Sequence, residues 1–253
     1  GKRRQFPRFY FMSEADLLDL LSNSSQPTKV LVQVDKILLS TAEIRLERSV
    51  GADRPVATHW VAGVGKEVVK FDPTVKLTGK AEAYLLSLLL AQIFTLSKCL
   101  SASIQRYPTK ARVDWLMQKD SKGEALDPSQ IVLLVAAIDY AKTIEQAMNT
   151  SKGDSKALSK SFDLTKTQLA DLIKLTQTPL AKPDRQRVMC MITLDAHNRD
   201  ITEILIKENV LVPSDFQWQS KLRPSFKTEV SKKAHVTCTA EFRICDAKFD
   251  YGF

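Results

Sequence analysis

Glycine is scarce in this sequence. Eight glycines among 253 residues leave little material for Gly-rich phosphate loops or for a barrel with many tight turns, and favour helices. The four cysteines, Cys99, Cys190, Cys238 and Cys245, form no CxxC pair, so neither a disulfide framework nor a zinc site is predicted. We expect reduced, buried thiols in a cytosolic protein. The longest uninterrupted apolar run, residues 131–138, is too short to cross a membrane, so no membrane partner is expected.

The charge balance is basic but diffuse. The net charge is +8, and 26% of the residues are charged. This excess permits acidic partners such as nucleic acid, anionic lipid or an acidic protein surface. Lysines and arginines are scattered without a long run, and the aromatics do not alternate with them as in a single-strand nucleic-acid platform. A solvated basic surface is the simpler interpretation.

An aromatic stretch, FPRFYFMS, occupies residues 6–13. Four aromatics in six residues, interrupted by proline and arginine, predict a short extended apolar segment. A helix is predicted from Glu14, with Ser13 as its N-cap and acidic residues in its first turn. Met12 and Leu17 stand at the two positions of a hydrophobic staple.

Apolar residues at three- and four-residue spacing predict further helices. These cover a segment with Val30, Val34, Ile37 and Leu38 on one face, then residues 80–105, 112–117, 130–148, 164–175 and 183–207, and a short helix capped by Ser214 with Gln217. Strict alternation instead predicts strands within residues 41–72 and over residues 236–244.

These patterns together predict a mainly α fold, a multi-helix bundle with a small inserted antiparallel β-sheet at about 41–72 and C-terminal β strands. We divide it into a helical segment, residues 1–233, and a β tail, residues 234–253. Because the chain stops on an aromatic–glycine sequence without a polar tail, we expect a fragment of a longer protein.

Three motifs invite a chemical interpretation and fail its requirements. Around Gly63–Lys66, Trp60 replaces the first glycine of a phosphate loop and Glu67 replaces its hydroxyl residue, so a hairpin turn is predicted. Cys238, Cys245 and His235 lack zinc spacing and a fourth ligand.

The polar cluster at residues 195–200 could hold an acid–base site made of Asp195, His197 and Asp200. His197 has no second histidine at ligand spacing, and a buried hydrogen-bonded network or an interface patch is the simpler interpretation. His59 and His235 are expected to be structural. We therefore assign no catalytic, cofactor-binding or metal-ligating residue.

Five segments resemble the linker of dynein heavy chains, in the family's order. Residues 6–22 resemble its FPRFYF-(L/M)-S segment and leucine-rich helix. The others are residues 129–135, similar to P-(G/S)-Q-V-V-L-x-V with its proline at 128, residues 192–201, similar to I-T-x-D-V-H-A-R-D-V, residues 215–223, similar to D-F-x-W-x-x-Q-L-R, and residues 247–253, similar to A-x-F-x-Y-G-Y. The chain departs from the family at Ile138–Lys142, where Trp-Thr is usual, and at Leu222–Phe226.

The resemblance implies the C-terminal part of the linker, running up to the first AAA+ module. On this resemblance, that part would be the ring-docked base of a mechanical lever and would itself not be an enzyme. The parent would be an ATP-driven, minus-end-directed microtubule motor of the cytoskeleton, with an axonemal isoform favoured. ATP and magnesium would bind in its AAA+ ring, beyond this chain.

The expected partners are that ring, microtubules, and the dynein intermediate and light intermediate chains, without nucleic acid or membrane. The alternative is a basic helical scaffold that binds an acidic protein or nucleic acid.

Overall fold

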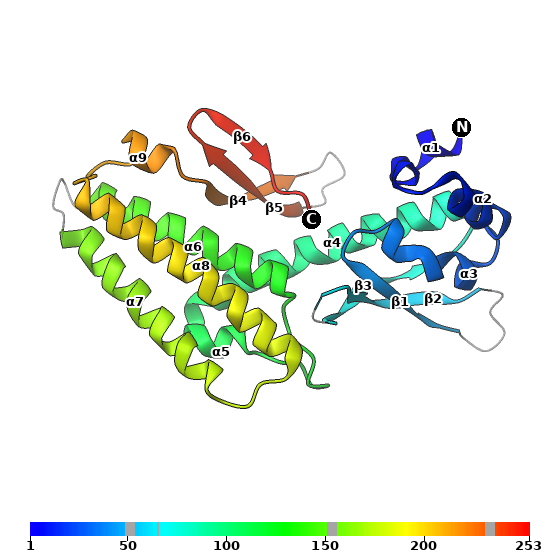
Figure 1. Ribbon diagram of the computed structural model, residues 1–253, viewed down its shortest axis with the longest axis horizontal. Coiled ribbons are helices and arrows are strands. Elements are labelled where there is room, and N and C mark those ends of the chain that lie inside the picture. The colour runs from blue at the N-terminus through cyan, green and yellow to red at the C-terminus, as the bar shows by residue number, and fades with distance from the viewer. Residues whose placement is uncertain (49–53, 65, 151–155, 231–235) are drawn as a thin grey trace. The chain divides into compact units, whose positions relative to one another are not determined.

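Long helices and two small sheets make up the protein (Figure 1). The structure is a computed structural model, and it describes residues 1–48, 54–64, 66–150, 156–230 and 236–253. The chain forms two compact units, residues 1–96 and residues 97–253. The predicted division at 233/234 lies outside the described residues and stays a prediction. The mainly α fold with two small antiparallel sheets is confirmed.

The first unit begins with short helical pieces. They are α1 (Lys2–Gln5), η1 (Pro7–Phe11), α2 (Glu14–Ser22), α3 (Pro27–Val30) and η2 (Leu31–Lys36). The predicted extended segment is wrong, because Pro7 starts a 3₁₀ turn there. The predicted cap is confirmed, since the Ser13 hydroxyl accepts a hydrogen bond from the Asp16 N–H at 3.1 Å.

The helix predicted around Val30 and Val34 is broken in two. Gln33 has φ −103° and ψ 19°, which interrupts the helix between α3 and the end of η2. All four residues of the predicted face are nevertheless buried, namely Val30, Val34, Ile37 and Leu38. A 3₁₀ turn and an α-helix share the three-residue spacing, so the pattern identified the buried face and missed the break.

The predicted β insert is confirmed as a three-stranded antiparallel sheet. Its order is β1–β2–β3, with β1 at Thr41–Glu47, β2 at Val56–Ala62 and β3 at Val68–Lys76. It therefore extends a few residues beyond the predicted end at 72. The turn predicted around Gly63 closes by a hydrogen bond from the Ala62 N–H to the Glu67 carbonyl at 2.8 Å; Gly65 and residues 49–53 lie outside the described residues.

Helix α4, Ala81–Arg106, follows the predicted span. Its residues up to 96 belong to the first unit and the rest to the second. Leu85, Leu96 and Leu100 of the predicted stripe are buried, whereas Ile93 is 37% exposed. Among the described residues, one helical stretch, residues 81–109, has the length and the apolar composition that a membrane span requires. This finding rests on length and composition alone. Polar residues spaced along this stretch interrupt its apolar runs, so it contains no long uninterrupted one.

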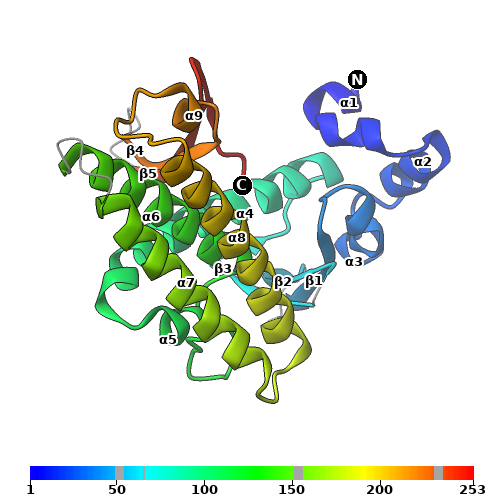
Figure 2. The same cartoon turned by 60° about the vertical axis from the view of Figure 1, so that its left-hand side comes forward.

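The second unit is built on three long helices. They are α6 (Ser129–Thr150), α7 (Lys156–Thr176) and α8 (Lys182–Lys207), and they lie side by side in both views (Figure 1 and Figure 2). Helix α7 starts earlier than the predicted 164. One buried hydrophobic cluster joins these helices to the residues that follow α8, and it contains Ala141, Ile144, Met148, Leu158, Ile201, Leu205, Val210 and Trp218.

Short elements complete the second unit. They are η3 (Tyr107–Thr109), α5 (Arg112–Leu116) and α9 (Phe216–Gln219). The predicted capping box at Ser214 is wrong, because the cap of α9 is Asp215, whose carboxylate accepts from the Gln217 N–H at 2.8 Å.

The C-terminal sheet contains two strands, β4 and β6, for which the sequence pattern gave no bounds. Its order is β4–β5–β6, with β4 at Arg223–Val230, β5 at Val236–Ile244 and β6 at Ala247–Asp250, all antiparallel. Strand β5 coincides with the predicted strand. No strand was predicted at β4, because Pro224 is also compatible with the end of the short helix that precedes it. Proline is tolerated near the start of an edge strand, and β4 is an edge strand here.

Candidate functional site

Helix α8 separates the residues of the polar cluster at 195–200. Asp195 and Asn198 are buried, whereas His197 and Asp200 are exposed. Residues three apart share a helix face and residues two apart do not. The structure therefore does not bring Asp195 and His197 together, and the acid–base arrangement considered for this cluster does not form.

Asp195 instead holds Arg112, which comes from the start of α5. The guanidinium bonds both carboxylate oxygens, with Nη2 to Oδ1 at 2.7 Å. The side chains are 12% and 3% exposed, respectively. Burial alone would lower the pKa of Arg112, but the hydrogen bonds and charge of Asp195 raise it above its usual value. The pair is a buried bidentate clamp between α5 and α8.

A third ionisable group, Asp139 on α6, lies near this clamp. Burial raises the pKa of Asp139, and the hydrogen bond with Tyr107 and the charges of Arg112 and Lys142 only partly oppose that effect. Tyr107, Arg112, Asp139 and Asp195 line a cavity of about 20 Å³. That volume is on the order of one water molecule, so it has no room for an organic substrate. The predicted buried network describes this cluster better than an active site does.

A second buried arginine, Arg187 on α8, fixes the start of α6. Its Nε donates to the Ser129 hydroxyl at 3.2 Å, and its Nη2 donates to the Asp127 carbonyl at 2.8 Å. The Asp127 carboxylate accepts from the Ser103 hydroxyl at 2.9 Å and from Arg106. Sequence reasoning did not identify Arg187. Its place one turn before the buried Met191 on α8 could have indicated an inward-facing cation.

The chain's departure at Ile138–Lys142 is accommodated within the core. The Tyr140 hydroxyl donates to the Asn198 carbonyl at 3.0 Å and lies 2.9 Å from the Thr202 hydroxyl. Its ring packs edge to face against the Trp218 ring, with the two ring centroids 6.3 Å apart. Tyr140 therefore links α6 to both α8 and α9.

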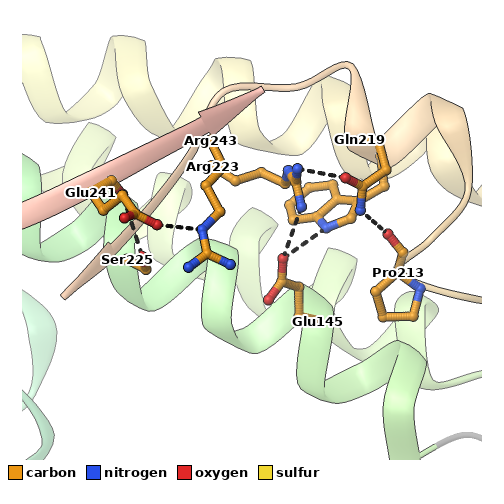
Figure 3. A network of polar contacts seen from close by, with 8 residues as sticks. Glu145, Pro213, Gln219, Arg223, Ser225, Glu241 and Arg243 are labelled. Carbon is orange, nitrogen blue, oxygen red and sulfur yellow. Dashed lines mark hydrogen bonds and ion pairs between the residues drawn. The ribbon is translucent and has the colours of Figure 1, made fainter. Parts of the chain in front are cut away.

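Glu145 on α6 joins the C-terminal elements to the bundle (Figure 3). Its Oε1 accepts from the Trp218 indole N–H at 3.1 Å and lies 3.5 Å from the Arg223 guanidinium. Arg223 also donates to Gln219 Oε1 at 2.7 Å, and Gln219 donates to the Pro213 carbonyl at 2.5 Å. One carboxylate thus connects α6 with α9 and with the first residue of β4.

Beside this network, a groove of about 570 Å³ is lined by residues of α6, β4 and β5 and by residues 104–108. Its walls combine apolar side chains with several charges: Ile104, Tyr107, Pro108, Val135, Ile138, Asp139, Ala141, Lys142, Glu145, Gln146, Asn149, Arg223, Pro224, Ser225, Phe226 and Arg243. The volume falls within the roughly 300–1,000 Å³ of typical ligand sites. No sequence motif indicated this groove, because it combines four separate segments of the chain, within residues 104–108, 135–149 and 223–226 and at Arg243.

The other predicted groups stay apart. Within the described part of the chain, no three His, Cys, Asp or Glu residues come close enough to hold a metal ion. His59 is half-buried, with Nδ1 3.0 Å from the Thr58 hydroxyl; His235 and the side chain of Cys238 are outside the described residues. The expectation of buried thiols is wrong for Cys190 and Cys245, which are exposed.

Comparison with known proteins gives consistent matches. A family model described as "Dynein heavy chain, N-terminal region 2" matches residues 1–103. The dynein alpha chain of the flagellar outer arm of Chlamydomonas reinhardtii is 38% identical over 256 residues, and dynein axonemal heavy chain 11 of Sus scrofa is 33% identical over 255 residues. Dynein axonemal heavy chain 9 of Homo sapiens is 29% identical over 253 residues. Each alignment covers 100% of this chain and 5% of the relative, so the chain spans about one twentieth of their length.

Proposed function

This chain belongs to the dynein heavy chain family, and on that premise we propose that it forms the C-terminal, ring-docked part of the linker, a mechanical element without catalytic activity. Its role is to transmit force between the moving part of the linker and the AAA+ ring of the same heavy chain. The five linker-like segments support this position, because they follow the family's order from residue 6 to residue 253.

The observation that carries the mechanical role is the buried clamping of the second unit. Arg112 with Asp195 joins α5 to α8, and Arg187 joins α8 to the start of α6. If these helices slid past one another, the partners would separate, and a buried charge or polar group would be left without its partner. Sliding is therefore strongly opposed. Close packing of three long helices adds to this resistance.

The parent protein follows from the same premise. We assign it as an ATP-driven, minus-end-directed microtubule motor of the axoneme in a cilium or flagellum, and the names of the flagellar outer arm and axonemal relatives support that location. ATP and magnesium bind in its AAA+ ring, and its partners are microtubules and the intermediate and light intermediate chains. Neither nucleic acid nor a membrane has a role in this assignment.

A direct test is ATP turnover by the purified 253-residue chain. We expect no release of phosphate above the buffer rate at any magnesium concentration, measured with a coupled assay. The matched control is the His197→Ala variant, which should give the same baseline, because His197 is exposed and its loss leaves the fold intact. Turnover by the unmodified chain that the variant loses would refute the non-catalytic role and would restore the acid–base interpretation of residues 195–200.

A further inference from the structure

The sheet of the first unit has two edges that differ in their hydrogen bonding. In the order β1–β2–β3, each outer strand has one side without a neighbouring strand. In the middle of β3, the Asp72 N–H donates to the Thr95 hydroxyl of α4 at 3.0 Å, and Pro73 has no N–H to donate. A further strand therefore could not form a continuous ladder along β3.

Strand β1 has an open edge. Beyond its pairing with β2, its one backbone–backbone hydrogen bond among the described residues runs from the Thr41 N–H to the Leu38 carbonyl at 3.0 Å. The register with β2 leaves Ala42 and Thr58 unpaired, so β1 continues from residue 43 to residue 47 without an inserted residue. Alternate residues of such a strand turn their N–H and C=O groups away from the neighbouring strand, where another strand can bind them.

A groove of about 690 Å³, here called the edge groove, follows this edge. It is lined by six consecutive residues of β1, 42–47, by residues 58–59 of β2, and by side chains of α3 and η2 that include Leu31 and Val32. Successive side chains of a strand point to opposite faces. Because all six residues of β1 line it, the edge groove runs along the strand edge and extends over one face onto β2.

The lining of the edge groove combines apolar surface with a regular row of charges. Val32 is 79% exposed, and Leu46 is half-buried. Glu43, Arg45 and Glu47 are exposed at every second position of β1, so they share one face of the strand. Within the described part of the chain, none of these three side chains has an ion-pair or hydrogen-bond partner. An acid, a base and an acid are therefore available in a row beside the open edge.

We propose that the β1 edge binds an extended segment of a partner protein as an additional strand, with a base, an acid and a base at alternate positions and apolar residues between them. Its charges lie opposite Glu43, Arg45 and Glu47, and its apolar residues lie on the other face, beside Val32 and Leu46. Opposite charges that face each other across two strands stabilise the pairing, and like charges destabilise it. Backbone hydrogen bonds supply affinity, and the charge order supplies specificity. This site does not rest on the linker role proposed above.

Fluorescence anisotropy with two labelled peptides tests the charge order on the whole 253-residue chain. The unmodified chain should bind Lys-Val-Glu-Val-Lys at least threefold more tightly than Lys-Val-Lys-Val-Lys, because the central lysine of the second peptide meets Arg45. Arg45→Glu should reverse this preference by a similar factor, and tight binding of the second peptide would also show that the variant is folded.

Lys160→Glu is the matched control for the charge order. Lys160 is exposed on α7, outside the edge groove, and the variant undergoes the same charge change as Arg45→Glu. It should keep the preference of the unmodified chain. The proposal fails if Lys-Val-Glu-Val-Lys does not bind, if Arg45→Glu keeps the original preference, or if Lys160→Glu reverses it as well. The last two outcomes would indicate a response to the net charge of the chain.

Two N-methylated forms of Lys-Val-Glu-Val-Lys test whether the peptide pairs as a strand. One form carries the methyl groups on the amides of both valines, and the other carries them on the amides of the glutamate and the last lysine. Since only alternate N–H groups of an added strand face β1, one form should bind at least fivefold more weakly, and the other should stay within about twofold of the parent peptide. Equal binding of the two forms would contradict strand addition.

A second copy of the chain is the other occupant that this edge would accept. Two β1 strands paired antiparallel about Ile44 would place Glu43 of each copy opposite Arg45 of the other. Sedimentation equilibrium of the unmodified chain without peptide distinguishes the two cases. We expect a monomer, whereas a dimer that Arg45→Glu dissociates would overturn the proposal, because the edge would then be occupied by the chain itself.

Discussion

At the scale of single residues, the clamp between Asp195 and Arg112 gives the sharpest contrast. Changing Asp195 to Ala leaves the Arg112 guanidinium, 12% exposed, without its counter-charge. We expect the free energy of unfolding to fall by about 3–5 kcal/mol. His197→Ala, two residues away and exposed, should change it by less than about 0.5 kcal/mol. Urea denaturation followed by circular dichroism measures both variants, and equal effects would contradict the assignment of Asp195 as a structural clamp.

Asp139 gives a pH-dependent expectation at the same scale. Burial raises its pKa above the model-peptide value of 3.8, against the opposing hydrogen bond with Tyr107 and the charges of Arg112 and Lys142. The folded state thus holds this proton more tightly than the unfolded state does. The stability that Asp139 contributes is therefore complete below pH 3.8 and is lost as pH rises through the folded-state pKa.

Asp139→Asn removes that titration while keeping a similar shape. We expect the variant to gain thermal stability relative to the unmodified chain on going from about pH 4 to about pH 7. Differential scanning calorimetry at several pH values measures the difference in Tm. A difference that is constant across this range would show that Asp139 does not titrate there.

At the scale of elements, the aromatics of η1 and of Phe6, which immediately precedes it, differ in burial. Phe6 and Phe9 are buried and meet edge to face at 5.0 Å, whereas Phe11 is 69% exposed. Phe9→Ala should lower the free energy of unfolding by about 3–5 kcal/mol, and Phe11→Ala by less than about 0.5 kcal/mol. Denaturant unfolding of the two single variants tests this, with Phe11→Ala as the matched control. Similar losses for both would contradict the described orientation of η1.

Periodicity predicted the long elements well and the short ones poorly. Helices α4, α6 and α8 and strands β1 and β5 carry enough repeats for one face to emerge. The turns η1 and η2 are five and six residues long, too short to separate a 3₁₀ turn from an extended segment or an α-helix. Strand β4 was not predicted, because Pro224 is compatible both with the end of a helix and with an edge strand.

At the scale of the whole molecule, the polar sites follow from contacts that local patterns do not encode. Arg112 and Asp195 are 83 positions apart, and Trp218 and Glu145 are 73 apart. For the cluster at 195–200 the sequence favoured a buried network or an interface patch, but it did not identify Arg112 as the partner of Asp195. The groove likewise exists only after the end of α4, η3, α6, β4 and β5 have come together. Family resemblance supplied the order of segments along the chain, which no periodicity could have done.

The two bonds that Glu145 makes constrain which substitutions this sequence can accept during evolution. Because its one carboxylate serves both Trp218 and Arg223, losing the acid alone would leave an indole N–H and a buried guanidinium short of acceptors. A substitution at position 145, 218 or 223 therefore affects the hydrogen bonding of the others. In an alignment of relatives we expect them to covary, with a neutral residue at 145 accompanied by an uncharged residue at 223.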